Sequence, residues 1–182
     1  ALLTTIALEL PLLMMIAGGS PAICQQIGSQ RYHLLLGFLP LTCALSGSVG
    51  LQTCSLTTEA VSFSQVAPES FLDWFRGEAG TTACLGAAMG IVVAFIALLA
   101  SCFDVIFAAA IYVAQILSII AASATGAITP LLLGALLKKD AKRWNGLVVT
   151  ALQDLVGCFA VVVVSYQMLV HLEKGEVNDA CR

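Results

Sequence analysis

Residues 144–170 read WNGLVVTALQDLVGCFAVVVVSYQMLV, an apolar run of 27 residues with a single acidic residue, Asp154. A helix rises about 1.5 Å per residue, so this run reaches roughly 40 Å and can cross the roughly 30 Å hydrocarbon core of a bilayer. An aspartate at the middle of such a helix costs about 2.5 to 3.5 kcal/mol, and one kept there usually faces a polar cavity, a partner cation or a permeating ion. The stretch therefore predicts an integral membrane protein with a cation site at Asp154.

The composition of the whole chain agrees with a membrane location. Hydrophobic residues make up 59% of the 182 residues, charged residues make up 10%, and the mean hydropathy is +0.97. Soluble domains carry about 25% charged residues. The net charge of −3 is too small to indicate a nucleic-acid partner. The composition thus identifies the lipid bilayer as the surroundings of the chain.

Five hydrophobic segments have roughly the length of a membrane span. They cover residues 1–17, 32–63, 79–101, 105–137 and 144–170. Continuous runs of Ala, Leu, Ile and Val predict helices, since strands of a membrane barrel alternate apolar and polar residues in short segments. The sequence therefore predicts an all-α integral membrane protein, a bundle of about five transmembrane helices forming one domain over residues 1–182.

The second segment is too long for one straight crossing. It contains Pro40 and, over residues 46–53, the sequence SGSVGLQT. Gly, Ser and Pro inside a membrane helix permit a kink or break whose freed carbonyls face protein or water, and such breaks often line ion sites. We expect a kink or break between Pro40 and Gly50, made either for an ion site or for packing alone.

Basic residues orient the spans. With five spans, the side of the N-terminus carries five of them and the other side three; they are Arg76, Lys138, Lys139, Lys142 and Arg143 against Arg31, Lys174 and Arg182. The positive-inside rule then predicts a cytoplasmic N-terminus, or a stromal or matrix one in an organelle.

Small residues mark the expected helix contacts. Gly86 and Gly90 form a GxxxG pair, and Ser118, Ala122 and Gly126 recur every four residues. Residues without bulky side chains let membrane helices approach closely, so we expect Gly86, Gly90 and Gly126 at helix contacts.

Two acids outside the span interiors have structural interpretations. Glu78 is expected to open the third helix, where the helix dipole favours a negative charge, and Asp104 to cap the fourth.

The seven cysteines contain no CxxC pair, and those within or at the ends of spans are interpreted as small apolar residues. These are Cys43, Cys54, Cys84, Cys102 and Cys158; a disulfide between Cys24 and Cys181 stays open. No Walker loop, nucleophile elbow or HExxH motif occurs, so no enzyme is proposed.

Four motifs, taken together and in order, resemble the transmembrane domain of the MgtE magnesium channels and their eukaryotic solute-carrier relatives. They are GSVGLQT over residues 47–53, then Trp74, Arg76 and Glu78 leading to Gly86 and Gly90, then GAITPLLL over residues 126–133, and TALQDLVG over residues 150–157. The resemblance runs from about Pro40 to Tyr166.

The resemblance implies a homodimer whose second and fifth helices line a central pore. It implies Mg²⁺ as the transported ion, held largely hydrated by the aspartate that Asp154 matches and by nearby oxygens, here Thr150, Ser48 and Gln52. The chemistry agrees, because Mg²⁺ sheds water reluctantly and is usually held by one or two carboxylates.

The chain departs from the family pattern at two places. Ser48 replaces an asparagine, and Glu59 stands where the family has a basic residue. Two other functions therefore stay open beside a divalent-cation channel or transporter: a non-transporting structural subunit of a larger membrane complex that kept the fold, and a proton-coupled cation exchanger, since a buried carboxylate can also titrate.

Overall fold

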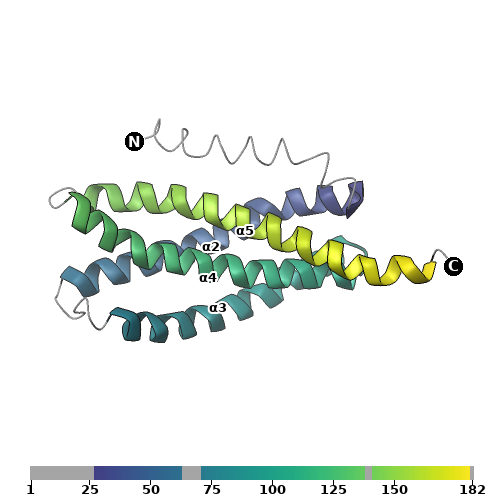
Figure 1. Ribbon diagram of the computed structural model, residues 1–182, viewed down its shortest axis with the longest axis horizontal. Helices are drawn as coiled ribbons and strands as arrows, with labels where there is room; N and C mark the ends of the chain where they lie inside the picture. The colour runs from purple at the N-terminus through teal and green to yellow at the C-terminus, as the bar shows by residue number, and fades with distance from the viewer. Residues whose placement is uncertain (1–26, 63–70, 138–140, 181–182) are drawn as a thin grey trace.

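The computed structural model describes residues 27–62, 71–137 and 141–180, and within these ranges it contains four long helices (Figure 1). They are α2 (Ser29–Ser62), α3 (Phe71–Ala100), α4 (Val105–Leu137) and α5 (Ala141–Ala180). Each contains a stretch long and apolar enough to cross a membrane, at Ser29–Ala60, Ala79–Ala100, Val105–Leu132 and Val149–His171. Four of the five predicted spans are thus confirmed, and the first, residues 1–17, lies outside the described residues.

The four helices form a bundle with α4 at its centre. Helix α4 packs against α2, α3 and α5, and α2 also packs along α5, whereas α2 and α3 barely touch. Helices α2 and α4 run parallel to each other and antiparallel to α3 and α5 (Figure 1). Helices α3 and α5 therefore begin at the same end of the bundle, which puts Arg76 at the end where Lys142 and Arg143 open α5, as predicted.

Helix α2 is continuous, so the predicted break between Pro40 and Gly50 is not observed. Pro40 lies inside the helix, and the structure does not confirm a kink there. Hydroxyl side chains follow it and donate to backbone carbonyls one turn back: Thr42 Oγ1 to Phe38 O at 3.1 Å and Ser46 Oγ to Thr42 O at 3.0 Å. Such bonds keep the hydroxyls satisfied inside an unbroken helix.

The two halves of the bundle have different cores. Near the start of α2 the core is apolar, with Leu35, Phe107, Ile111 and Leu169 at most 1% exposed. In the other half the buried positions of α2 and α4 are mostly hydroxyl-bearing or small. Thr53 Oγ1, Ser123 Oγ and Thr82 Oγ1 join α2, α4 and α3 through hydrogen bonds of 3.3 and 3.2 Å. Asp154 belongs to this second, polar half.

The turn between α3 and α4 confirms one prediction about the acids and corrects the other. Asp104 Oδ1 accepts a hydrogen bond from Phe107 N at 3.1 Å, so it caps α4 as predicted, and Asp104 Oδ2 also pairs with Arg31 Nε at 2.7 Å. Glu78 does not open α3, because that helix begins at Phe71. Hydropathy predicts where the apolar span begins, whereas helix α3 itself begins about two turns before its apolar span.

Candidate ion site between α2 and α5

Asp154 lies on the flank of α5 that meets α2. Its side chain is half-buried, and a Cβ built on Gly47 of α2 would stand 4.0 Å from Asp154 Oδ1. Thr150, also half-buried, precedes it by one helical turn, so both side chains share one side of α5. The carboxylate of Asp154 therefore stands beside α2 at Gly47.

Ser48 and Gln52 lie one turn apart on the outer face of α2. Both are exposed, and so are Ser55 and Glu59 further along the same face. The Ser48 hydroxyl donates to Ala44 O at 2.9 Å and the Ser55 hydroxyl to Gln52 O at 2.8 Å, so each hydroxyl oxygen can still accept hydrogen bonds. We call these four residues the polar stripe of α2; three of them, up to Ser55, lie well inside the candidate span Ser29–Ala60.

The four predicted ligands therefore fall into two neighbouring pairs. Thr150 and Asp154 stand on α5, while Ser48 and Gln52 stand on the adjacent outer face of α2, next to the Gly47 that Asp154 approaches. They do not enclose one pocket within a single copy, because Ser48 and Gln52 are exposed. Among the described residues no group of three or more His, Cys, Asp or Glu could hold a metal ion. The arrangement offers one carboxylate and several neutral oxygens, the sparse donor set that suits a hydrated Mg²⁺ rather than a dehydrated ion in a protein cage.

Glycines hold α2 close to its neighbours behind the polar stripe. A Cβ on Gly126 of α4 would collide with Gly50 O, and one on Gly50 would collide with the side chain of Gln153 and lie 2.8 Å from Ala122 O.

Glycines also lie at the contact between α3 and α4. A Cβ on Gly86 of α3 would contact Ile119 Cγ2 at 3.4 Å, and one on Gly90 would stand 3.1 Å from the ring of Tyr112. The predicted contacts of Gly86, Gly90 and Gly126 are confirmed.

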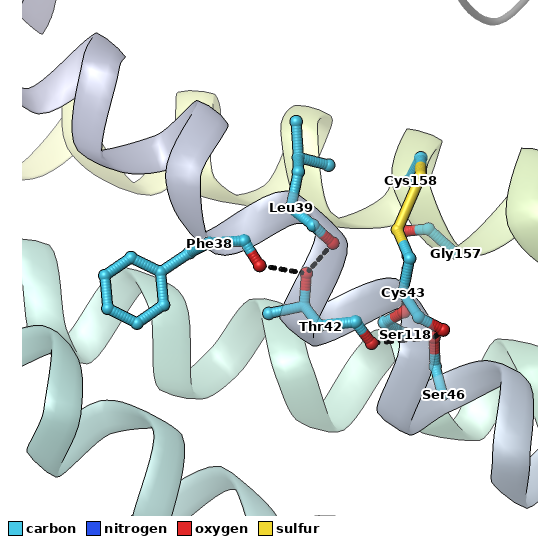
Figure 2. The surroundings of a disulfide bond; sticks show 8 residues. All are labelled: Phe38, Leu39, Thr42, Cys43, Ser46, Ser118, Gly157 and Cys158. Carbon is cyan, nitrogen blue, oxygen red and sulfur yellow. Dashed lines mark hydrogen bonds between the residues drawn. A yellow bond between two sulfur atoms is a disulfide. The ribbon is translucent and has the colours of Figure 1, made fainter.

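A disulfide between Cys43 and Cys158 joins α2 to α5, as Figure 2 shows, and Cys158 follows Asp154 by one helical turn. The two Cα atoms are 6.0 Å apart and the residues are 115 positions apart in sequence. The interpretation of these two cysteines as small apolar residues was wrong. Their spacing carries no signal for pairing, which depends on the packing of two helices distant in sequence. Cys24 and Cys181 lie outside the described ranges.

Beside the disulfide, a polar layer connects three helices. Ser118 Oγ of α4 lies 3.4 Å from Gly157 O of α5, and a Cβ on Gly157 would stand 3.1 Å from Ser46 Oγ of α2 (Figure 2). Two buried glutamines flank this layer, Gln115 of α4 and Gln153 of α5. Neither glutamine was predicted from the sequence as a polar site, although a polar side chain inside an apolar span is rare enough to be a signal.

Comparison with known proteins relates the chain to a transporter family. A family model described as MgtE, divalent cation transporter, matches residues 39–164, which covers α2 from Leu39, all of α3 and α4, and α5 through the disulfide and Asp154. No curated protein matches the chain.

Proposed function

This chain belongs to the MgtE family of divalent cation transporters, a transporter family and not an enzyme family, and on that premise we propose that it conducts Mg²⁺ along the polar stripe of α2 past Asp154. The observation that carries the proposal is the position of the stripe. Ser48, Gln52 and Ser55 are exposed within a span of α2. They lie next to Gly47, the residue of α2 near which the Asp154 carboxylate of α5 stands.

The stripe cannot face lipid at low cost. The Ser48 and Ser55 hydroxyls donate to carbonyls of their own helix, but the Gln52 amide and the Glu59 carboxylate would be costly in hydrocarbon. Polar side chains of this kind in membrane helices usually face the bundle interior, a partner or water. We propose that the partner is a second copy of this chain. In a two-fold symmetric dimer the same patch meets itself, so two polar stripes and two Asp154 side chains border one central path.

Such a path suits a hydrated divalent cation. Two carboxylates, one from each copy, supply the charge that compensates Mg²⁺, while Thr150, Ser48 and Gln52 offer oxygens to the water molecules that the ion retains. No nucleotide site is needed. The membrane potential contributes about 2.3 kcal/mol per elementary charge for each 100 mV, and the ion carries two such charges.

Mg²⁺ uptake by liposomes tests the proposal. Asp154→Asn keeps the shape of the side chain and removes its charge, so we expect uptake to fall at least about tenfold. The protein should still assemble, because asparagine has nearly the same volume and keeps one acceptor oxygen. Asp104→Asn is the matched control, since its carboxylate lies in the α3–α4 turn, and should retain uptake. Equal uptake by the wild type and Asp154→Asn would overturn the ion site. No uptake by either would instead favour a non-transporting subunit of a larger complex.

Cross-linking tests the dimer separately. In a chain whose free cysteines are replaced by alanine, Ser48→Cys should form an intermolecular disulfide in membranes, seen as a species of twice the mass on a non-reducing gel. Ile91→Cys, on the exposed apolar face of α3, is the control and should stay monomeric. Cross-linking of both variants to the same extent would indicate random collision and contradict the dimer.

A further inference from the structure

Two glutamines in the interior of the bundle have unusual surroundings. Gln115 of α4 is 0% exposed and Gln153 of α5 is 1% exposed. Within the described part of the chain, neither the amide nitrogen nor the amide oxygen of either side chain has a hydrogen-bond partner. A glutamine amide offers two donors and an acceptor with two lone pairs, so both side chains keep their full hydrogen-bonding capacity in a region without bulk water.

The two amides stand on either side of the polar layer formed by Ser118, Gly157 and Ser46. Gln115 precedes Ser118 on α4 by three residues, and Gln153 precedes Gly157 on α5 by four. Because α4 and α5 run antiparallel and meet at Ser118 and Gly157, these offsets add along the bundle axis. At about 1.5 Å rise per residue, the two glutamines lie roughly 10 Å apart with the layer between them.

Leaving these amides unpaired would be costly. Buried polar atoms in folded proteins nearly always have a partner, either a protein group or an ordered water molecule. Water occupies interior sites where it meets two to four polar groups, whereas apolar cavities stay dry. Near Gln153 a second polar group is present. The amide nitrogen of Gln153 and the carbonyl oxygen of Ala122 both lie close to the point where a Cβ on Gly50 would stand.

We propose that each copy of the protein holds two internal water sites, one at Gln153 between α2, α4 and α5 and one at Gln115 in the interior of the bundle. The Gln153 site lies behind α2, on the side opposite the exposed polar stripe. The Gln153 site occupies the α5 turn that also carries Asp154, so ordered water supports that turn from within the copy. The sites follow from burial and hydrogen-bonding capacity and do not depend on ion transport.

An experimental structure of the protein in lipid nanodiscs, at a resolution that shows ordered water, tests the proposal directly. We expect density for a water oxygen within hydrogen-bond distance of the Gln153 amide and for a second one at the Gln115 amide. Direct hydrogen bonds from both amides to protein groups, including residues outside the described ranges, would overturn the proposal. Amides with neither water nor a protein partner would overturn it as well.

Thermal unfolding of methionine variants gives an independent test. Methionine matches the length of glutamine and removes the amide, so in Gln153→Met and Gln115→Met the bonds to water are lost and the midpoint should stay the same or fall. If the amides are dry and unpaired, removing them relieves a penalty, and the midpoint should instead rise by about 2 to 4 °C or more. Gln167→Met is the control, because Gln167 is exposed on α5 and should change little.

Discussion

Helices α2 and α3 each expose one long face within a membrane span, and the two faces differ in chemistry. On α3 the exposed side chains are large and apolar, with Ile91 62%, Val92 56% and Phe95 60% exposed. On α2 the polar stripe of Ser48, Gln52, Ser55 and Glu59 runs between exposed leucines. Side chains that are exposed in a single copy therefore indicate different surroundings on the two helices. The face of α3 suits lipid, whereas the polar stripe of α2 suits the second copy and the ion path that we propose.

The two sides of α2 also differ in how closely they are packed. Its inner side touches α4 and α5 through Gly50, where no side chain fits, while its outer side includes Gly37, around which a Cβ would meet nothing within 4 Å. The inner contacts therefore fix the rotation of α2 that turns the polar stripe outward.

Breaking the inner contact should have the largest effect on this arrangement. In Gly126→Leu the new side chain must displace backbone atoms of Gly50, which cannot move aside as a flexible side chain can, so we expect a loss of about 3 kcal/mol or more. Size-exclusion chromatography in detergent should show an aggregated or misassembled species. Gly37→Leu makes the same change where there is room and should elute as the wild type does. A native elution profile for Gly126→Leu would contradict the close contact.

Placing the same charge on each outer face tests the contrast between α2 and α3. Ile91→Asp puts a carboxylate on the lipid-facing side of α3 and should cost about 2.5 to 3.5 kcal/mol, with much reduced insertion and yield. Ser48→Asp adds the identical group to the polar stripe of α2, where water or a partner can solvate it, and should insert and assemble at close to the wild-type level. Comparable losses for both variants, measured by membrane-fraction yield and thermal stability, would show that the two faces share one environment.

A smaller effect is expected at the α3–α4 turn, which fixes where the apolar face of α3 ends. Asp104→Ala removes both the cap of α4 and the ion pair with Arg31, and should destabilise the protein by about 1 to 2 kcal/mol. Asp104→Asn retains a capping side chain and loses only the charge, so its unfolding midpoint should lie between those of the alanine variant and the wild type. Identical midpoints for all three proteins would mean that neither interaction contributes to stability.

Much of this fold could be predicted from the sequence, because the bilayer imposes the length and the apolar character of each span. The four described spans lie within a few residues of their predicted positions, and small residues at helical spacing located the contacts of Gly86, Gly90 and Gly126. Asp154 was identifiable because a carboxylate in a span is rare and costly.

Other features depend on which sides of the helices meet, and the sequence does not contain that information in local form. The Cys43–Cys158 disulfide joins residues 115 positions apart. The continuity of α2 through residues 46–53 reflects hydroxyls bonded to the helix backbone and glycines used for packing, so the same residue types that permit a break here support an unbroken helix. The polar stripe is visible as residues spaced by three or four, but only the fold shows that it faces outward.

Cysteine accessibility along the two outer faces tests the central claim most directly. The five cysteines outside the disulfide are replaced by alanine, and Ser48→Cys, Gln52→Cys and Ile91→Cys are each reacted in liposomes with a positively charged, membrane-impermeant methanethiosulfonate. If α2 borders an aqueous cation path, we expect Ser48→Cys and Gln52→Cys to react at least about tenfold faster than Ile91→Cys, because thiolates form readily only in water. Added Mg²⁺ should slow both reactions. Rates at Ser48 and Gln52 as low as at Ile91, and unaffected by Mg²⁺, would contradict the proposed path.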